Sequence, residues 1–277
     1  MGRGGRVIRM TTRTLASLPD AGSFPGLLRR YRTARRLSQL DLALTCDISA
    51  RHLSFLETGR ASPSREMVLQ LSEGLLLPLG ARNSLQQAVA GFASVFPASP
   101  LASEALGPFR RILTEMMERH APYPALLCDR HWNVLDASPV AKVLLGALQD
   151  DPAETNLIRM LTSSRAAEIA IVNFAEMLAE MQGRIHLEAL EAADDEVLTG
   201  LLSELEAATA RYPLPPGHAL RSPLVPLTLR TAAGELSFLS TIAHFGTSED
   251  VTIRDLRLEL LFPADEATRA ALRAMAG

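Results

Sequence analysis

Apolar residues in the first third of the chain recur at the spacing of amphipathic helices. Phe24, Leu28 and Tyr31 lie three or four positions apart, which predicts a helix over 24–37. Serines that stand just before apolar runs are typical N-caps. With the same spacing they predict four more helices: 39–45, 50–57, one that follows Ser64, and about 81–92. Five short helices indicate a compact all-α domain, which we place at residues 24–95.

The pattern changes around residue 100. Pro97 and Pro100 predict a linker, and we group the amphipathic helix that follows, about 104–120, with it as residues 96–122. That helix joins the two halves, pairs with its copy in a dimer, or packs on its own domain. Later β-prone runs predict strands at 125–128, 133–136, 224–230, 236–245 and 256–262, the first two forming a hairpin. Helical runs fall at 139–148, 155–161, 165–190 and 194–211. Residues 123–268 are therefore predicted to form an α+β domain, followed by a tail at 269–277.

The two halves differ in charge. Residues 1–91 hold thirteen arginines and six acidic residues, a net charge of +7. Residues 92–277 hold fifteen basic and twenty-five acidic residues, a net charge of −10. This asymmetry indicates that the first half meets a polyanion. Residues 1–23 form a basic arm that we expect to be disordered. The arm either contacts DNA or is a solvated tail or a misassigned start.

The segment 37–64 has the residue pattern of a helix-turn-helix. Ala43 must be small, because the second helix crosses the first there. Asp47 lies in the short turn where a positive φ is usual, and Asp tolerates that backbone better than most residues. Glu57 is expected to pair with an arginine or to cap locally. The second helix, 50–57, presents its polar start outward, as a recognition helix does in a major groove. Apolar contacts between the two helices are predicted for Leu42, Ala43, Ile48, Leu53 and Leu56.

Residues around this second helix are candidates for contacts with DNA. Arg51 is the leading candidate for a bidentate contact to guanine. Ala50 or Phe55 is placed to touch a thymine methyl group, and Gln39 and Arg60 are placed to bind phosphate. One recognition helix reads few base pairs, so we expect a homodimer on double-stranded DNA. The full predicted DNA-binding set is Gln39, Ser49, Ala50, Arg51, His52, Phe55, Arg60 and Arg35.

The motifs of both halves resemble a known family. The Ser-Gln, Leu-Ala, Ile-Ser and Pro-Ser pairs, with Glu57 and Gly59 between them, resemble the Cro/C1-type, or XRE, helix-turn-helix over 24–78. Three later motifs resemble the MmyB-like transcription regulators: Tyr123-Pro124-Ala125-Leu126, Trp132-Asn133-Val134-Leu135 and Phe262-Pro263-Ala264-Asp265. The resemblance runs from Phe24 to Thr268. It implies an XRE-type domain joined to a PAS-like ligand-binding domain, with a long-chain fatty acid as the suggested ligand.

The chain departs from that family in the middle of its second domain. A Phe…Trp segment that is usual before the sheet is missing, and Trp132 is the only tryptophan. Ser138 stands where many relatives place asparagine after the second strand. These departures concern the ligand more than the fold.

Apolar and methionine-rich positions in the second half favour an adaptable lipophilic pocket. The candidate lining residues are Ile158, Met160, Ile171, Phe174, Met177, Leu178 and Met181, with Phe238, Ile242 and Leu260 as the sheet wall. Ordinary core packing is the alternative for each of them. Arg184 and His186 are candidates to meet a ligand carboxylate at the pocket mouth, with solvated surface as their alternative. No cofactor is required, and a bound fatty acid is the expected effector.

Other functional classes find little support. The histidines lack metal-ligand spacing, and the sequence has no Gly-rich phosphate loop or nucleophile elbow, so we predict neither a metal site nor an enzyme. No apolar run is long enough to span a membrane, no secretory signal is apparent, and Cys46 and Cys128 are predicted to be buried thiols, which favours a cytoplasmic location.

We therefore predict a sequence-specific DNA-binding transcription regulator that is controlled by a lipophilic small molecule such as a fatty acid. The alternative is a DNA-binding adaptor whose PAS-like domain only dimerises or binds a protein partner.

Overall fold

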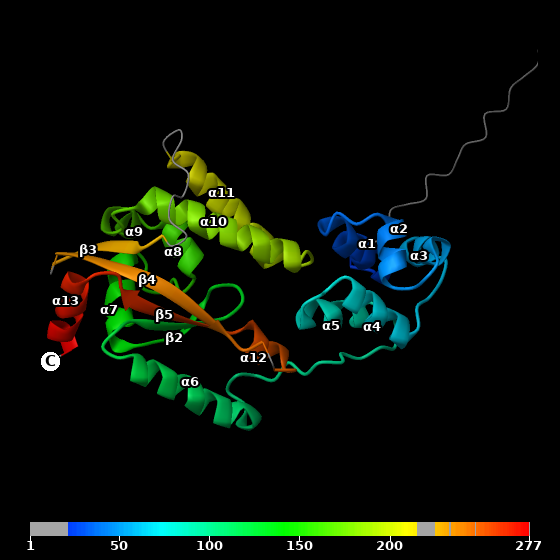
Figure 1. Ribbon diagram of the computed structural model, residues 1–277, viewed down its shortest axis with the longest axis horizontal. Coiled ribbons are helices and arrows are strands. Elements are labelled where there is room, and N and C mark those ends of the chain that lie inside the picture. The colour runs from blue at the N-terminus through cyan, green and yellow to red at the C-terminus, as the bar shows by residue number, and fades with distance from the viewer. Residues whose placement is uncertain (1–21, 215–224, 233, 247, 277) are drawn as a thin grey trace, which may run out of the picture.

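The computed structural model describes residues 22–214, 225–232, 234–246 and 248–276 (Figure 1). The basic arm at 1–23 lies almost entirely outside the described residues. Five helices form the first domain: α1 (Phe24–Ala34), α2 (Gln39–Thr45), α3 (Ala50–Glu57), α4 (Arg65–Gly74) and α5 (Leu79–Gln87). All five predicted helices are present, which confirms the all-α domain.

Serine N-caps define where four of these helices begin. Ser23, Ser38, Ser49 and Ser64 each accept a hydrogen bond from a backbone N–H in the first helical turn. At Ser38 the cap is reciprocal, because the Asp41 carboxylate accepts from the Ser38 backbone N–H. The apolar faces then meet in one core, in which Leu28, Tyr31, Leu42, Leu53 and Leu56 are fully buried.

The second domain is built on one five-stranded antiparallel sheet. Its strands are β1 (Ala125–Cys128), β2 (Val134–Ala137), β3 (Leu227–Thr231), β4 (Gly234–His244) and β5 (Arg257–Pro263), in the order β2-β1-β5-β4-β3. Every pair of neighbours is antiparallel. All five predicted strands are present to within three residues at each end, and the first two form the predicted hairpin.

Helices cover both faces of the sheet. One face is covered by α7 (Pro139–Leu148), α8 (Leu157–Ser163), α9 (Arg165–Ala170), α10 (Phe174–Glu191) and α11 (Glu196–Arg211), which share one hydrophobic cluster with β3, β4 and β5. The other face carries α6 (Gly107–His120), which follows the short 3-10 helix at Glu104–Leu106 (Figure 1). Leu113 and Met117 of α6 are buried against β1 and β5. Of the three roles left open for this helix, the structure therefore shows packing on its own domain.

Two predicted boundaries are corrected. The single helix expected over 165–190 is two helices, because residues 171–173 turn aside to meet β3. Ile171 forms a β-bridge with Leu229, and the Val172 backbone N–H donates to Thr228 at 2.8 Å. The described part of the predicted tail, residues 269–276, belongs instead to α13 (Glu266–Ala276), whose Leu272 is fully buried against the sheet. One further short helix, α12 (Val251–Asp255), was not predicted.

Both cysteines are buried and unpaired, as expected. Asp47 has a φ of 47°, which confirms the left-handed turn residue between α2 and α3. Within the described ranges, we find no helix with the length and apolar character that crossing a bilayer requires.

Candidate DNA-binding surface and ligand-binding cavity

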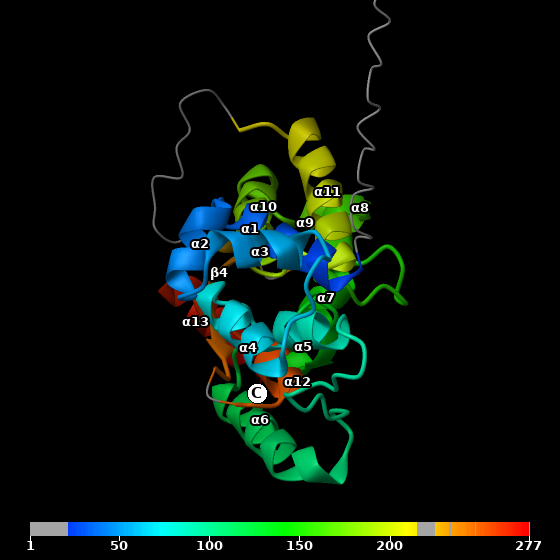
Figure 2. The ribbon, with the colours of Figure 1, turned by 90° about the vertical axis from the view of Figure 1, so that its right-hand side faces the viewer.

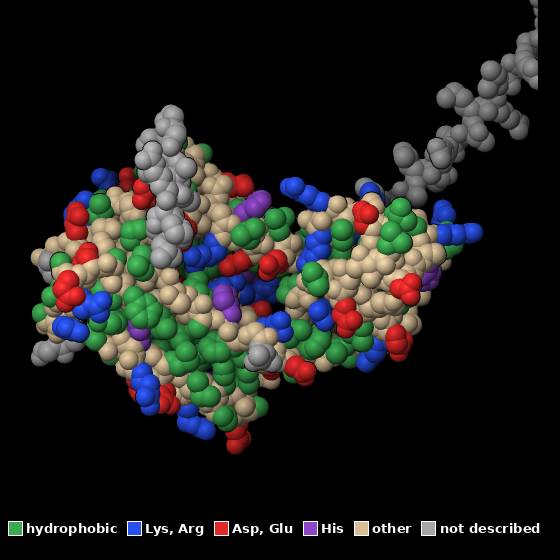
Figure 3. Space-filling model, in the orientation of Figure 1, with side chains coloured by type: hydrophobic (Ala, Val, Ile, Leu, Met, Phe, Trp, Pro, Cys, Tyr) green, Lys and Arg blue, Asp and Glu red, His purple; other side chains and the backbone are tan. Residues whose placement is uncertain are grey.

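Helices α2 and α3 lie at the end of the molecule that is remote from the sheet (Figures 1 and 2). The Ser49 hydroxyl caps α3 by accepting from the His52 backbone N–H at 3.1 Å. Arg51 is exposed in the first turn, and its guanidinium lies 5.3 Å from the Phe55 ring centroid. The ring limits the directions in which this cation can point. Basic side chains project from this end of the molecule in Figure 3.

The remaining predicted DNA contacts differ in exposure. Ser49 and Arg60 are exposed, whereas Ala50, His52 and Phe55 are half-buried along the sides of α3. Arg60 follows Gly59, whose φ of 70° ends the helix and lets the chain turn away. Six of the eight predicted residues thus belong to one surface, the start and sides of α3 and the turn after it. The other two, Gln39 and Arg35, make contacts inside the protein.

A buried ion pair joins α1 to α3. Arg32 donates two hydrogen bonds to the Glu57 carboxylate, from Nε at 2.6 Å and from Nη2 at 2.9 Å. Gln39 adds a third, from Nε2 to Glu57 Oε2 at 2.7 Å. Glu57 therefore pairs with an arginine, as predicted. One amide N–H of Gln39 donates to Glu57 and so holds the start of α2 against α3. A phosphate contact would therefore have to use the second amide N–H of Gln39.

Arg35 is the one predicted DNA contact that the fold turns elsewhere. Its guanidinium Nη2 lies 3.4 Å from the Leu76 carbonyl oxygen and 3.3 Å from that of Glu191, at the end of α10. Ala193, in the loop after α10, packs against the core of the first domain. Arg35 therefore bridges the two domains, and its contact with DNA stays a prediction. Sequence spacing within one helix could not reveal a partner 156 positions away.

The second domain contains an apolar cavity of about 100 Å³ between the sheet and its helical cover. Four predicted lining residues form part of its wall: Met160, Ile171, Met177 and Met181. Five more, Ile158, Phe174, Leu178, Phe238 and Ile242, lie in the surrounding core rather than among the described wall residues. Leu260 is corrected: it faces α6 on the other side of the sheet, and Leu261 lines the cavity. A shift of one residue along a strand reverses the face.

Sequence reasoning missed two wall residues that carry polar groups. Trp132 lies in the β1–β2 turn with a φ of 65°, which is rare for a bulky residue. Its indole Nε1 donates to Glu188 Oε2 at 3.1 Å, and Glu188 also pairs with Arg257 at 2.9 Å. Glu259 is the single charged residue among the described wall residues. Its position between leucines in the strand predicted at 256–262 was the available signal.

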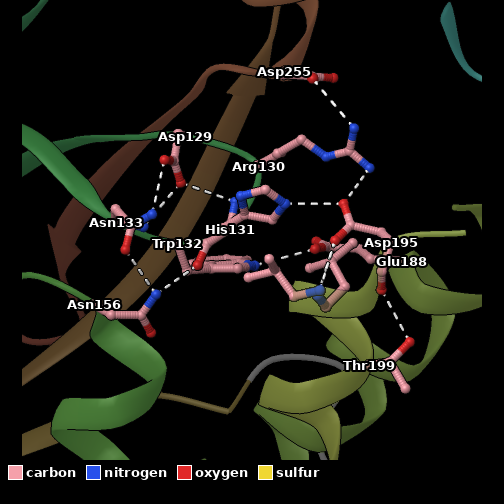
Figure 4. A network of polar contacts seen from close by, with 12 residues as sticks. Asp129, Arg130, His131, Trp132, Asn133, Asn156, Glu188, Asp195, Thr199 and Asp255 are labelled. Carbon is pink, nitrogen blue, oxygen red and sulfur yellow. Dashed lines mark hydrogen bonds and ion pairs between the residues drawn. The ribbon is translucent and has the colours of Figure 1, made fainter. Parts of the chain in front are cut away.

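A network of polar contacts connects the Trp132 turn to the loop between α10 and α11 (Figure 4). Asp195 accepts from Arg130 Nη2 at 2.6 Å and lies 2.9 Å from His131 Nε2. Burial alone would raise the pKa of Asp195, but the hydrogen bonds from His131 and the Leu198 N–H, with the Arg130 charge, lower it to about 2. The loop that Asp195 anchors is the one that meets Arg35.

The linker supplies a second junction between the domains. The Ser99 backbone N–H donates to Asp250 Oδ2 at 3.1 Å, and the Val251 N–H donates to the Pro97 carbonyl at 2.7 Å. Figure 3 shows acidic, basic and histidine side chains gathered where the two domains meet. The cavity wall, the Trp132 turn, the Asp195 loop and the first domain are therefore in continuous contact.

Comparison with known families now assigns both halves. A model of the MmyB-like transcription regulator ligand binding domain matches residues 109–275, and a helix-turn-helix model matches residues 28–80. The chain belongs to the MmyB-like transcription regulators. It is similar to helix-turn-helix-type transcriptional regulators of Mycobacterium bovis and of two strains of Mycobacterium tuberculosis. Each is 28% identical over 207 residues, which cover 68% of this chain and 77% of the relative.

The family match confirms the resemblance found in the sequence. This regulator joins a DNA-binding helix-turn-helix to a ligand-binding domain, and its family consists of transcription regulators rather than enzymes. The ligand-binding model begins within α6 and ends within α13, the two segments that the structure adds to the second domain.

Proposed function

We propose that this regulator reads a specific DNA sequence with α3 and that Arg51 makes its main base contact. The observation that supports this is the exposed Arg51 at the capped start of α3, held near the Phe55 ring. A guanidinium in that place suits the two acceptors of guanine in the major groove. Ser49 and Arg60 are placed beside it for phosphate contacts, and a homodimer on paired half-sites extends the sequence that is read.

The test is selection of bound sequences from a random DNA pool, followed by affinity measurements on the selected site. Arg51→Ala should weaken binding by about 1–3 kcal/mol and relax the preference at one or two base pairs. Arg119→Ala is the matched control, since Arg119 is an exposed arginine of α6 on the second domain. Unchanged affinity and unchanged preference in Arg51→Ala would refute the assignment. The mass of the complex on the selected site reports the dimer.

We also propose that a lipophilic small molecule occupies the cavity of a PAS-like second domain and controls DNA binding. The support is an apolar wall rich in methionine, whose flexible side chains adapt to different ligands. A volume of about 100 Å³ is smaller than the roughly 150 Å³ that holds one benzene in an engineered cavity. A long acyl chain therefore requires Met160, Met177 and Met181 to move, and this movement reaches Trp132 on the same wall.

Native mass spectrometry of the purified full-length protein, before and after addition of long-chain fatty acids, tests the presence of a ligand. A bound lipophilic mass that also changes the affinity for the selected DNA supports a ligand-controlled regulator. A dimer that takes up no such molecule and binds DNA unchanged supports the adaptor instead. Since the regulator acts on DNA, we place its action in the cytoplasm.

The route from cavity to DNA in this proposal runs through the Trp132 turn. Ligand would shift Trp132, and the turn carries Arg130 and His131, which hold Asp195. The loop at 191–195 then changes its contact with Arg35 of the first domain. This route does not pass through α6, because α6 packs on the opposite face of the sheet.

A further inference from the structure

Glu259 is an acidic side chain in the middle of an otherwise apolar wall. It lies on β5, the central strand, beside Leu126 of β1 and Ile242 of β4. Leu258 and Leu260 point to the α6 face, so Glu259 and Leu261 point into the cavity. A charged residue at such a position is costly unless it is paired, so its presence calls for a partner.

The described residues supply only some of the partners that the Glu259 carboxylate could bind. Ser240 Oγ donates to Glu259 Oε1 at 2.5 Å. That is the one hydrogen bond of the Glu259 carboxylate among described residues, and no described cation lies within 4 Å of it. Burial raises the pKa of Glu259, and the nearby Glu180 carboxylate raises it further, while the Ser240 bond and Arg184 act in the opposite direction.

Helix α10 adds a second carboxylate to this region. Glu180 Oε1 accepts from Arg184 Nη2 at 3.0 Å, whereas Glu180 Oε2 is buried and has no hydrogen-bond partner. Arg257 and Glu188, the other charged pair beside Trp132, neutralise each other at 2.9 Å. Two carboxylates therefore face one guanidinium, and when both are ionised the region has one negative charge in excess.

Apart from Glu259, the cavity wall suits an apolar ligand group. Leu126, Leu144 and Met177 present only apolar atoms, which suit an alkyl chain. A ligand carboxylate beside Glu259 would bring two like charges together, and one of them would have to stay protonated. A protonated amine would instead pair with Glu259 and satisfy an acceptor that the protein leaves open.

We propose that the effector of this regulator is a lipophilic cation, an alkyl chain that ends in a protonated amine, with Glu259 and Ser240 as the subsite for its head. This inference rests on the proposed ligand-binding function of the cavity and departs from the fatty acid that the family resemblance implies. Glu259 selects the charge of the head, and the methionines accommodate the length of the chain.

The experiment compares three ligands with the same eight-carbon chain: octylamine, 1-octanol and octanoate. Binding to the full-length protein at pH 7 is followed by calorimetry and by the fluorescence of Trp132, the only tryptophan and a wall residue. We expect octylamine to bind at least about tenfold more tightly than octanoate, and 1-octanol to lie between them. Glu259→Gln, which keeps an acceptor for Ser240, should remove most of the advantage of the amine and improve octanoate.

The control is Glu206→Gln, which removes an exposed carboxylate of α11 and should leave the order of the three ligands unchanged. If octanoate or octanol binds as tightly as octylamine, the proposal of a cationic effector is wrong. The cavity would still be a ligand-binding site. If Glu259→Gln weakens the binding of all three ligands equally, Glu259 has a structural role. That result would also refute the proposal of a cationic effector. Binding of none of the three would refute both this inference and the lipophilic-ligand function.

Discussion

The two domains of this regulator fill their interiors in different ways. The DNA-binding domain buries one complete ion pair, Arg32 with Glu57, and Gln39 adds a third hydrogen bond to the same carboxylate. The ligand-binding domain keeps a cavity, and its half-buried carboxylates at Glu180 and Glu259 have only part of their hydrogen-bonding capacity used by described residues. Full packing holds a recognition surface in one geometry, whereas vacant volume and open acceptors leave room for a ligand. The difference separates a rigid reader from an adaptable sensor.

The largest expected effect comes from breaking the matched charges of the reader. Glu57→Ala leaves Arg32 buried without its anion, which should destabilise the first domain by about 3–5 kcal/mol and abolish DNA binding. Denaturation followed by circular dichroism measures the loss. Trp132 fluorescence reports the second domain separately and should change little. Glu73→Ala, an exposed carboxylate of α4, is the control. A Glu57→Ala protein as stable as this control would mean that the ion pair does not hold α1 to α3.

A smaller effect, larger in the first domain than in the second, is expected from adding side-chain volume to each core. In the reader, a Cβ at Gly74 would overlap Cys46 Sγ, so Gly74→Ala should cost about 1–3 kcal/mol despite its better helix propensity. Cys46→Ala in the same chain should recover most of that loss. Chemical denaturation of the single and double variants measures both, and additive losses would show that the two positions do not clash.

In the sensor, Ala141→Leu places extra carbons on the cavity wall, where space is available. Its stability should stay within about 1 kcal/mol of the original protein, and its affinity for an eight-carbon ligand should fall. DNA affinity without ligand should be unchanged. If Ala141→Leu destabilises the second domain as strongly as Gly74→Ala destabilises the first, the two cores do not differ in spare volume. The proposed difference between the domains would then be wrong.

The smallest effect concerns the loop between α10 and α11 and appears only at acidic pH. The pKa of Asp195 is lowered to about 2 in the folded state, below its ordinary value of 3.8. A lowered carboxyl pKa contributes stability that is present above about pH 4 and is lost as the pH falls towards 2. Asp195→Asn should therefore flatten the pH dependence of unfolding in that window. Asp136→Asn, on the exposed part of β2, is the control. An unaltered pH profile in Asp195→Asn would show that its contacts with His131 and Arg130 do not contribute.

Sequence alone predicted the five helices of the first domain, the five strands of the second and the choice of α3 as the recognition helix, but it missed α12 and α13. Helix spacing and serine caps located α1 to α5, and short β-prone runs located all five strands, because both signals arise from residues a few positions apart. Glu57, the last residue of the recognition helix, was expected to pair with an arginine or to cap locally, and it pairs with Arg32. Arg51 emerged from the same local argument.

Only the tertiary structure decided what the side chains meet. Arg35 was predicted to contact DNA, yet its guanidinium lies 3.3 Å from the Glu191 carbonyl oxygen at the end of α10. Leu260 and Leu261 have the same apolar character, and the register of β5 against β1 and β4 decides which of them lines the cavity. Residues 269–276 belong to a helix, α13, because Leu272 packs against the sheet. Each outcome depends on partners far away in the chain, and short-range periodicity carries no information about them.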